Sequence, residues 1–504
     1  MKIKILDCTI RDGGYYNNWR FSDNFVEKYL NTLQKCKIDY VEIGYRKNIK
    51  DKNFGKFINV TDQLSKKLKK KRNLSFSIMI DLADIVKQNL NIDRHFSSQK
   101  KSGIDLIRIA SSYEDLKHLK QTIIKLKKKK YKVSVNLMKF TALTKNQILN
   151  FFNECRKYKI DFYYIADSFG NCTPELINNI SKYLRQKKFS LNKFGFHGHD
   201  NLGLGNENAM TALKNGFKII DTSIMGMGRG AGNVKLEEFI YNLDKKNQDK
   251  MFYIQKFIEE VMMKMKQKYN WGTNFSYFYA AKNFIHPTFV QRLLTEKKFN
   301  FYNLIEILSF LSKSKSSKYD ANIFDNFFLE VTKFKEKKIK FRNKKVNIFT
   351  NNCKNIDYIV NSSDKKKYLT ASLNLNEKFK NFPFDYIFVS NPYRFFTEIN
   401  SIKKSKKKIV IPNFKNFQKN IKSNTNIIKY NFNYSNNKFK INKLECSYKL
   451  NLVIFYAISF FITNNFSEIN IYGFSKNKQN KKIEIFFSNF ISKNNLKTKL
   501  AFHS

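Results

Sequence analysis

The sequence predicts an α/β protein: a (β/α)8 TIM barrel, followed by a helical extension and a small separate α/β domain. In the first 240 or so residues, eight short apolar runs alternate with helix-length polar stretches, which is the count and size of such a barrel. Polar residues also follow several of these runs directly, and the functional residues of a TIM barrel lie at the carboxyl ends of its strands. The alternative, an open doubly wound sheet, needs a glycine-rich phosphate loop after its first strand, and Arg11-Asp12-Gly13-Gly14 is not that loop.

The expected elements follow from the period of the apolar residues. The eight barrel strands are expected at residues 3–10, 38–45, 74–80, 106–110, 132–138, 162–167, 194–199 and 219–226. We place the catalytic barrel at residues 1–245, a helical extension with Met and Leu stripes at 246–340, and a basic α/β domain of unknown role at 341–504. Within the last domain we expect strands at 346–350, 386–391, 408–412 and 469–474 and a helix at 448–463.

The charge of the chain bears on its partners. The formal net charge is +53, which would suit a nucleic-acid partner. However, Lys, Asn, Ile, Phe and Tyr are over-used together, as an A/T-biased coding sequence produces, and arginine, the better residue for bidentate phosphate contacts, is scarce beside lysine. We therefore interpret the charge as solvated lysines and expect no nucleic acid, while attraction to anionic substrates stays open.

Cysteine usage and the apolar runs indicate the compartment. The six cysteines include no CxxC pair, which favours reduced thiols in a cytoplasmic protein. A signal peptide is not expected, because residues 1–10 already form the first strand. The longest apolar run near the C-terminus, residues 452–463, is shorter than the roughly 20 residues that span a membrane, so we expect no membrane span.

The residues at the predicted ends of strands one and seven form the most informative pattern. Asp12 supplies a carboxylate, and His197 and His199 supply two imidazoles that share one face because they lie two apart on a strand. Strands one and seven are only one strand apart in a closed barrel, so the three side chains can reach one ion. Mixed oxygen and nitrogen ligands suit Mn²⁺ or Mg²⁺, with Zn²⁺ not excluded; the alternative is a pair of surface imidazoles.

These residues resemble the motifs of the pyruvate carboxyltransferase or hydroxymethylglutaryl-CoA-lyase-like superfamily, also called the DRE-TIM metallolyases. The motifs are Asp7-x-Thr9-x-Arg11-Asp12-Gly13, His197-x-His199 and Gly228-x-Gly230-Ala231-Gly232-Asn233, in the right order at the right strands. The resemblance covers the barrel. Residues 277–294 are also similar to the helical segment after the barrel in the 4-hydroxy-2-oxovalerate aldolase-like members, which the chain resembles most.

The resemblance implies a divalent-metal-dependent aldolase or lyase. Such an enzyme breaks or forms a carbon–carbon bond next to the carbonyl of a 2-oxo acid or related acyl compound, through a metal-bound enolate. Arg11 would then donate hydrogen bonds to the enolate oxygen or the carboxylate; the alternative is an arginine that only pairs with Asp7 or Glu42. Asn233 is either a fourth metal ligand or a residue that only shapes the glycine turn.

The motifs do not by themselves fix the substrate-binding and proton-transfer residues. We expect Glu42, Tyr45, Gly228 and Gly230 to line the substrate site. In the aldolase branch a histidine acts as the general base three residues after the metal-binding aspartate, but Tyr15 occupies that position here. The lyase branch has a catalytic cysteine in the glycine-rich loop, and this loop has none. Tyr15, Tyr45 and Asp167 are therefore the candidates, in that order.

Two other functions stay open. A Claisen-type, acyl-CoA-dependent synthase would use the same metal and arginine. From a different class, a non-catalytic barrel could accompany binding of an anionic polymer by the basic C-terminal domain, which predicts binding that weakens steeply with salt. The expected partners are a small 2-oxo acid or acyl-CoA substrate, and a homodimer is an open option.

Overall fold

The computed structural model describes residues 2–503 apart from 50, 71, 244–247, 296–298, 300, 330–338, 363–367, 376–381, 405–406, 416–425, 435–438, 449–451 and 476. The chain forms two compact units. The first comprises Met1–Lys297 and Leu311–Tyr319, and the second comprises Lys298–Phe310 and Asp320–Ser504. The division at residues 245 and 340 stays a prediction.

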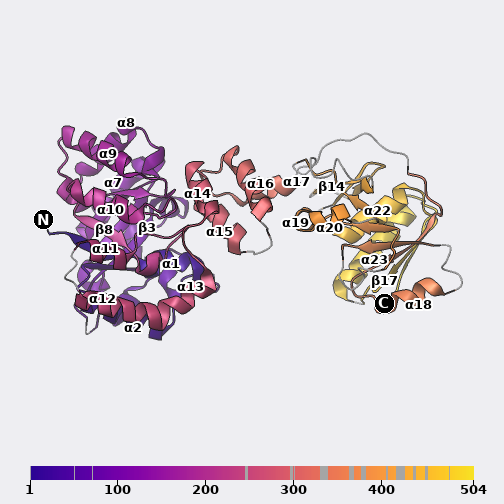
Figure 1. Ribbon diagram of the computed structural model, residues 1–504, viewed down its shortest axis with the longest axis horizontal. Coiled ribbons are helices and arrows are strands. Elements are labelled where there is room, and N and C mark those ends of the chain that lie inside the picture. Colours follow the sequence, from indigo (N-terminus) through magenta and orange to yellow (C-terminus); the bar gives the residue numbers. More distant parts are fainter. Residues whose placement is uncertain are drawn as a thin grey trace. The chain divides into compact units, whose positions relative to one another are not determined.

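Eight parallel strands of the first unit close into a barrel in which each strand pairs with the next and β8 pairs with β1 (Figure 1). They are β1 (Lys4–Asp7), β2 (Tyr40–Tyr45), β3 (Ser75–Asp81), β4 (Leu106–Ser111), β5 (Lys132–Met138), β6 (Phe162–Asp167), β7 (Phe194–Gly198) and β8 (Ile219–Thr222). Their residues are mostly buried because one face of each strand lines the interior and the other packs against helices. The predicted TIM barrel and its eight strands are confirmed.

Helices follow the strands and surround the barrel (Figure 1). They are α1 (Thr9–Asn17), α2 (Asp23–Lys35), α3 (Asp62–Lys69), α4 (Leu82–Lys87), α5 (Ile92–His95), α6 (Gln99–Ser102), α7 (Leu116–Lys128), α8 (Lys145–Arg156), α9 (Pro174–Gln186), α10 (Gly205–Lys214) and α11 (Leu236–Leu243). Several begin at side chains that accept a hydrogen bond from a free backbone N–H of the first turn. Ser22 caps α2, Thr61 caps α3, and Thr144 forms a capping box with Gln147 at α8.

The ends of three strands differ from the prediction. β1 ends at Asp7, whose carboxylate accepts the backbone N–H of Thr9 (2.9 Å) at the start of helix α1. Arg11 and Asp12 therefore lie on that helix and not at the end of the strand. β7 ends at Gly198, one residue before the second histidine of the motif, and β8 ends at Thr222, before a short helical turn at Ile224–Gly226.

The chain of the first unit continues in helices after the barrel, as predicted. They are α12 (Gln248–Phe257), α13 (Met263–Tyr269), α14 (Phe275–Lys282) and α15 (Pro287–Thr295), and α16 (Phe301–Ser312) comes next. A loop at 271–274 precedes α14. Helix α15 begins at Pro287, because proline lacks the N–H that the first helical position leaves unused.

The second unit contains an open, parallel, seven-stranded sheet in the order β13-β12-β11-β10-β9-β17-β18. Its strands are β9 (Lys345–Phe349), β10 (Leu369–Leu373), β11 (Tyr386–Phe388), β12 (Lys408–Ile411), β13 (Ile427–Lys429), β17 (Glu468–Tyr472) and β18 (Lys499–Phe502). A small sheet comprises β14 (Asn431–Tyr434), β15 (Lys440–Ile441) and β16 (Glu445–Tyr448). The helices are α17 (Ala321–Leu329), α18 (Ile356–Asn361), α19 (Pro392–Thr397), α20 (Ile399–Lys404), α22 (Val453–Thr463) and α23 (Lys478–Lys493).

The predicted α/β domain is confirmed, with corrections to its elements. The four strands expected there correspond to β9, β11, β12 and β17. The helix expected at 448–463 begins only at Val453; Tyr448 belongs to β16, and 449–451 lie outside the described residues. Strands β10, β13 and β18 were not expected, because they are only five, three and four residues long and offer little pattern to recognise.

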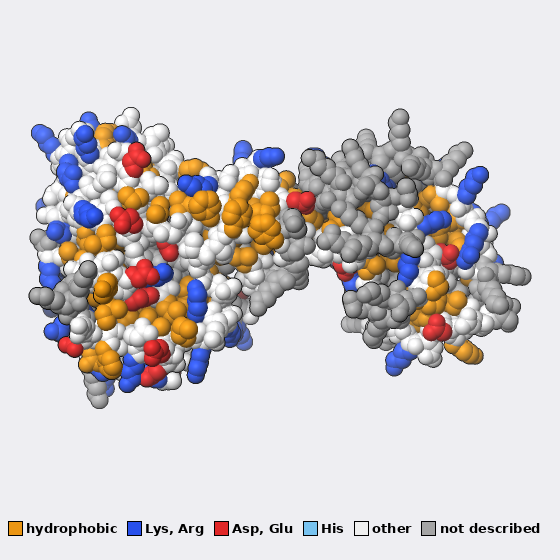
Figure 2. All heavy atoms as spheres, viewed as in Figure 1, with side chains coloured by type: hydrophobic (Ala, Val, Ile, Leu, Met, Phe, Trp, Pro, Cys, Tyr) orange, Lys and Arg blue, Asp and Glu red, His pale blue; other side chains and the backbone are white. Residues whose placement is uncertain are grey.

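Lysine and arginine side chains are spread over the visible face of the barrel unit, with acidic side chains among them (Figure 2). Some form exposed ion pairs, such as Lys28 with Glu260 (2.8 Å), which contribute little to stability. All six cysteines are buried and unpaired, as predicted for reduced thiols. No helix among the described residues is both long and apolar enough to cross a membrane.

Candidate metal centre

Asp12, His197 and His199 come together at the carboxyl end of the barrel, as the sequence predicts. One ligand atom from each side chain lies within 4.8 Å of the other two. Opposite ligands of one divalent ion are separated by about 4.2 Å, so the spacing is close to that of a metal site. All three residues are buried. Asp12 reaches the cluster from helix α1, and the histidines reach it from the end of β7.

Both imidazoles are oriented by hydrogen bonds at Nδ1. His199 donates its Nδ1 proton to the Gly232 carbonyl (3.2 Å), and the Nδ1 of His197 lies 2.9 Å from the Asp221 carboxylate. A proton on each Nδ1 leaves the Nε2 lone pair free for a metal. Burial lowers the pKa of His199 to about 3, against the opposing effect of Asp12, so its ring is neutral at neutral pH, as a ligand must be.

Two buried oxygen atoms, one in the cluster and one beside it, lack a hydrogen-bond partner among the described residues. They show whether the site suits a divalent cation. They are Asp12 Oδ2 and Asn233 Oδ1. The amide nitrogen of Asn233 donates to Cys8 Sγ (3.4 Å), which leaves the amide oxygen available. A Cβ at Gly228 would lie 2.5 Å from that amide, so only glycine leaves room for it. Two imidazole nitrogens and two unsatisfied oxygens fit a divalent cation.

Arg11 lies beside the cluster with one donor group still free. Its Nε donates to Glu42 Oε2 (2.6 Å) and its Nη1 donates to Asp12 Oδ1. Burial alone would raise the pKa of Asp12, but Arg11 and the two histidines hold it below its ordinary value. Arg11 therefore does pair with Glu42, which was the predicted alternative to a role in substrate binding. Its Nη2, however, is buried without a partner among the described residues and can donate to a ligand.

A buried ionic network lies inside the barrel beneath the cluster. Arg108 of β4 donates to Glu42 of β2 (3.0 Å) and to Asp221 of β8, and its guanidinium lies 4.4 Å from the centre of the Tyr164 ring. Asp221 in turn holds His197. Because unpaired buried charges are very unfavourable, these pairs fix one another in place and orient a candidate ligand.

Tyr15 and Tyr45 lie together next to Arg11. Their hydroxyls are 3.1 Å apart, and the guanidinium of Arg11 lies 5.8 Å from the centre of the Tyr45 ring. Burial and the neighbouring Tyr15 raise the pKa of Tyr45 well above its ordinary value. Tyr45 is therefore the weaker candidate for a proton acceptor, and Tyr15 is only partly buried.

The remaining predicted site residues have partners within the protein. Asp167 accepts backbone N–H groups from Asn171 (3.1 Å) and Cys172 (3.0 Å), which ties it to its own loop, while burial raises its pKa to about 7. The carbonyl of Gly230 accepts the Tyr16 hydroxyl (2.7 Å). These contacts shape the loops around the site, and substrate contacts of these residues stay a prediction.

Several residues around the site were not identified from the sequence. They are Cys8, Arg108, Lys139, Asp221 and Arg229. A charged residue inside an apolar strand was the available signal for Arg108 in Leu106–Ser111 and for Asp221 in Ile219–Thr222, since buried charges need partners. His286 belongs to the segment 277–294 that resembles the aldolase-like members, and the structure adds its contact with Arg229 (3.4 Å).

A family model described as HMGL-like matches residues 2–262, which is 261 of the 504 residues. The chain belongs to the HMGL-like family. The resemblance of its motifs to the DRE-TIM metallolyases is thereby confirmed, and the matched residues contain all three candidate metal ligands and the interior network.

Relatives of this HMGL-like chain match its barrel. It is 26% identical over 246 residues to an oxaloacetate decarboxylase of Mycobacterium tuberculosis, covering 48% of this chain and 70% of the relative. It is 24% identical over 243 residues to a 4-hydroxy-2-oxovalerate aldolase of Geobacillus genomosp. 3, covering 48% and 71%. The crystal structure of the N-terminal domain of a candidate aldolase from Bacteroides vulgatus is 32% identical, with a TM-score of 0.52, covering 60% of this chain and 99% of that domain.

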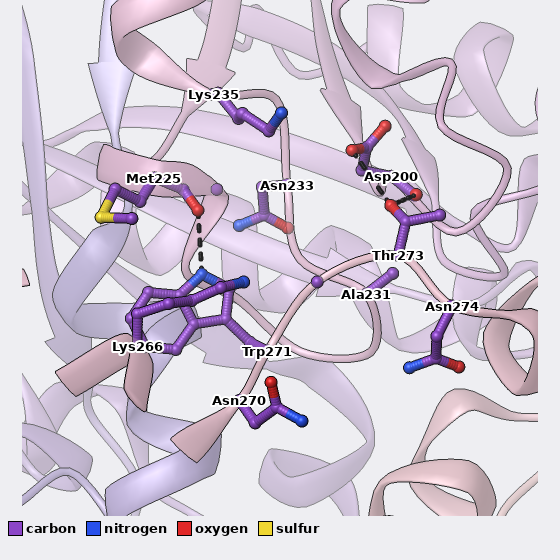
Figure 3. Close-up of a pocket in the computed structure, with 12 residues that line it drawn as sticks. Asp200, Met225, Ala231, Asn233, Lys235, Lys266, Asn270, Trp271, Thr273 and Asn274 are labelled. Carbon is purple, nitrogen blue, oxygen red and sulfur yellow. Dashed lines mark hydrogen bonds between the residues drawn. The ribbon is translucent and has the colours of Figure 1, made fainter. Parts of the chain in front are cut away.

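The glycine-rich loop and residues 270–274 line a cavity of about 380 Å³ (Figure 3). Met225, in a left-handed conformation (φ 52°), lies at its edge. Trp271 Nε1 donates to the Met225 carbonyl (2.8 Å), and the Met225 N–H donates to Glu237 (3.0 Å). Held from both sides, this turn supports the loop that continues to Asn233.

We expect Glu237 to make stability depend on pH. Burial raises its pKa to about 7, so its contribution to stability is full below the unfolded value of 4.5 and is lost as the pH rises through 7. The Glu237→Gln variant keeps an acceptor for Met225 but cannot titrate. From pH 5 to pH 8 the unfolding free energy of the parent should decrease more than that of the variant. The difference between the two decreases should be on the order of 2 kcal/mol.

Urea unfolding of the full chain at both pH values checks this expectation. Glu238→Gln is the matched control, because Glu238 is exposed and forms its ion pair with Lys235 at the surface. Equal pH dependence in the parent and in Glu237→Gln would contradict the assignment.

Proposed function

We propose that the protein is a divalent-metal-dependent lyase of the aldolase type. It breaks or forms a carbon–carbon bond next to the carbonyl of a 2-oxo acid or related acyl compound. The observation that carries this proposal is the convergence of Asp12, His197 and His199, with the free Nη2 of Arg11 beside them. The names of the relatives support the substrate class, because oxaloacetate and 4-hydroxy-2-oxovalerate are both 2-oxo acids.

The residues that would hold the metal are the Asp12 carboxylate, the two histidine Nε2 atoms and the Asn233 amide oxygen. When bound, a divalent cation supplies Lewis-acid stabilisation of negative charge on the substrate's carbonyl oxygen. Mixed oxygen and nitrogen donors without a thiolate favour Mn²⁺ or Mg²⁺. Cys8 stays protonated, because burial raises the pKa of its thiol well above the ordinary value.

Arg11 would bind the substrate oxygen on which negative charge develops. Its Nη2 is the free donor, and the bonds to Glu42 and Asp12 fix its direction before the substrate arrives. A donor that is held in place in this way needs no reorganisation during the reaction and stabilises the enolate more than the keto form.

Tyr15 is the residue that we propose for proton transfer. It occupies the position of the general base in the motif, and its hydroxyl has a hydrogen-bonding path to Tyr45. Arg229 lies over the Tyr15 ring, with 5.9 Å from guanidinium to ring centre, and this contact holds the ring in place.

Metal analysis of the purified full chain, followed by pyruvate enolisation, tests the function. Exchange of the pyruvate methyl protons for solvent deuterium is followed by NMR. We expect a bound divalent metal, exchange in the metal-loaded protein, and none after treatment with a chelator. Absence of metal or of exchange would overturn the aldolase proposal, and acyl-CoA binding without exchange would favour the Claisen-type synthase.

A further inference from the structure

Three basic residues that are not candidate metal ligands lie at the carboxyl end of the barrel. Arg229 lies in the glycine-rich loop after β8, Lys139 directly follows β5, and His286 precedes α15. Ser168, just after β6, links them: its carbonyl accepts from Arg229 Nη2 (3.2 Å), and its hydroxyl accepts the backbone N–H of Lys139 (3.0 Å). Arg229 Nη1 lies 3.4 Å from His286 Nε2.

Both ring nitrogens of His286 face an N–H donor. Thr288 N–H lies 3.3 Å from Nδ1, and Arg229 Nη1 lies 3.4 Å from Nε2. A neutral imidazole has one acceptor nitrogen, so it can accept from only one of these two donors. An anion seated beside this contact would accept from Arg229 and would satisfy the remaining donor.

The positive charge of this group is not balanced within the described residues. There, no Asp or Glu forms an ion pair with Arg229 or Lys139. Burial, and then the charges of Arg229 and Lys139, lower the pKa of His286 well below its ordinary value. Burial also lowers the pKa of Lys139, with Arg229 and Lys318 acting in the same direction and Glu114 against them. Clustered cations of this kind attract an anionic ligand.

The group lies next to the candidate metal ligands. The guanidinium of Arg229 lies 5.9 Å from the centre of the Tyr15 ring. The Tyr15 hydroxyl lies 3.1 Å from that of Tyr45, whose ring centre is 5.8 Å from the guanidinium of Arg11. One end of the site thus offers the cluster and Arg11 Nη2, which suit a 2-oxo carboxylate. The other end offers Arg229, Lys139 and His286, which this carboxylate does not satisfy.

We propose that Arg229, Lys139 and His286 bind a second anionic group of the substrate, so that the site selects a 2-oxo acid with a carboxylate or phosphate at its far end. This inference rests on the proposed function and names its substrate class. Arg229 supplies a planar guanidinium, Lys139 a mobile ammonium, and His286 an imidazole ring in contact with Arg229. A 2-oxo acid with an uncharged tail would leave the charges of Arg229 and Lys139 unbalanced among the described residues.

Calorimetric binding to the metal-loaded full chain tests the inference with pairs of acids that differ only at the far end. The pairs are 2-oxoglutarate with 2-oxovalerate, 2-oxoadipate with 2-oxohexanoate, and 3-phosphohydroxypyruvate with 3-hydroxypyruvate. We expect the doubly anionic member of at least one pair to bind at least about tenfold more tightly, as one charge-assisted hydrogen bond provides. The pair that shows the preference distinguishes a carboxylate from a phosphate.

The variants Arg229→Gln and Lys139→Asn should each remove most of this preference. Both should leave the affinity for the acid with the uncharged far end within about threefold of the parent value. Asparagine is chosen because position 139 is left-handed (φ 57°), a conformation that asparagine tolerates. Lys214→Gln, at the exposed end of α10 on the amino-terminal side of the barrel, is the matched control and should keep the preference.

The outcomes separate this inference from the function on which it rests. If the acids bind but no pair shows a preference, or if the preference survives in both variants, the inference is overturned and the proposed function stands. If no 2-oxo acid binds and pyruvate exchange is also absent, the proposed function fails and the inference fails with it.

Discussion

Replacing His197 and His199 together with alanine is expected to abolish divalent-metal binding while the barrel stays folded. The two imidazoles supply two of the three clustered ligand atoms, and both rings come from one short segment at the end of β7. Loss of a residue that only orients a ligand costs 10- to 100-fold in metal affinity, so loss of two ligands should cost more than about 100-fold. Metal content after dialysis and titration calorimetry with Mn²⁺ measure the effect.

Two further variants make this result specific. Asp221→Asn should weaken metal binding only by about 10- to 100-fold, because it changes the partner of His197 and leaves all ligands present. His118→Ala removes an exposed imidazole on α7 and should change nothing. A double histidine variant that kept its full metal content would show that the cluster is not the metal site.

Replacing Arg11 with lysine is expected to lower kcat by about 10²- to 10³-fold with little change in metal content. Lysine keeps the charge next to Asp12 and Glu42 but loses the planar group whose Nη2 is free to donate. Removing one fixed donor to a developing oxyanion has an effect of this size. Initial rates of pyruvate deuterium exchange, together with metal analysis of the same preparations, measure both quantities.

Arg46→Lys is the matched control for this substitution. Arg46 is also buried at the barrel and paired with a carboxylate, that of Asp62 (2.6 Å), but it has no contact with the metal cluster. Its replacement should lower the free energy of unfolding and have little effect on the rate of deuterium exchange. Wild-type exchange in Arg11→Lys would exclude Arg11 as the donor to the substrate oxygen.

The barrel strands were predictable because their signal is local. Runs such as Leu106–Ser111 and Phe162–Asp167 are apolar along most of their length, as strands buried on both faces must be. The end of β1 was placed too late for a physical reason that is also local: the Asp7 carboxylate accepts the Thr9 N–H and turns the chain into helix α1. The spacing of apolar residues along the sequence does not reveal such a side-chain cap.

The candidate metal ligands were predictable for a different reason. His197 and His199 share a face wherever their strand lies, and closure of the barrel brings Asp12 to them even though it stands on a helix. The partners that orient them were not predictable. Asp221 reaches His197 from β8, and Arg108 reaches Asp221 across the interior from β4, so the network depends on all the strands being in register.

The sequence by itself determined the barrel, the three candidate ligands and the superfamily, because each follows from patterns within short segments. Only the tertiary structure decided which groups remain available among the described residues: the Nη2 of Arg11, the amide oxygen of Asn233, and the charges of Arg229 and Lys139, which no acidic residue there balances. Whether a donor or acceptor is free depends on every group that folding places around it. Those neighbours come from segments as distant as β1 and the loop before α15.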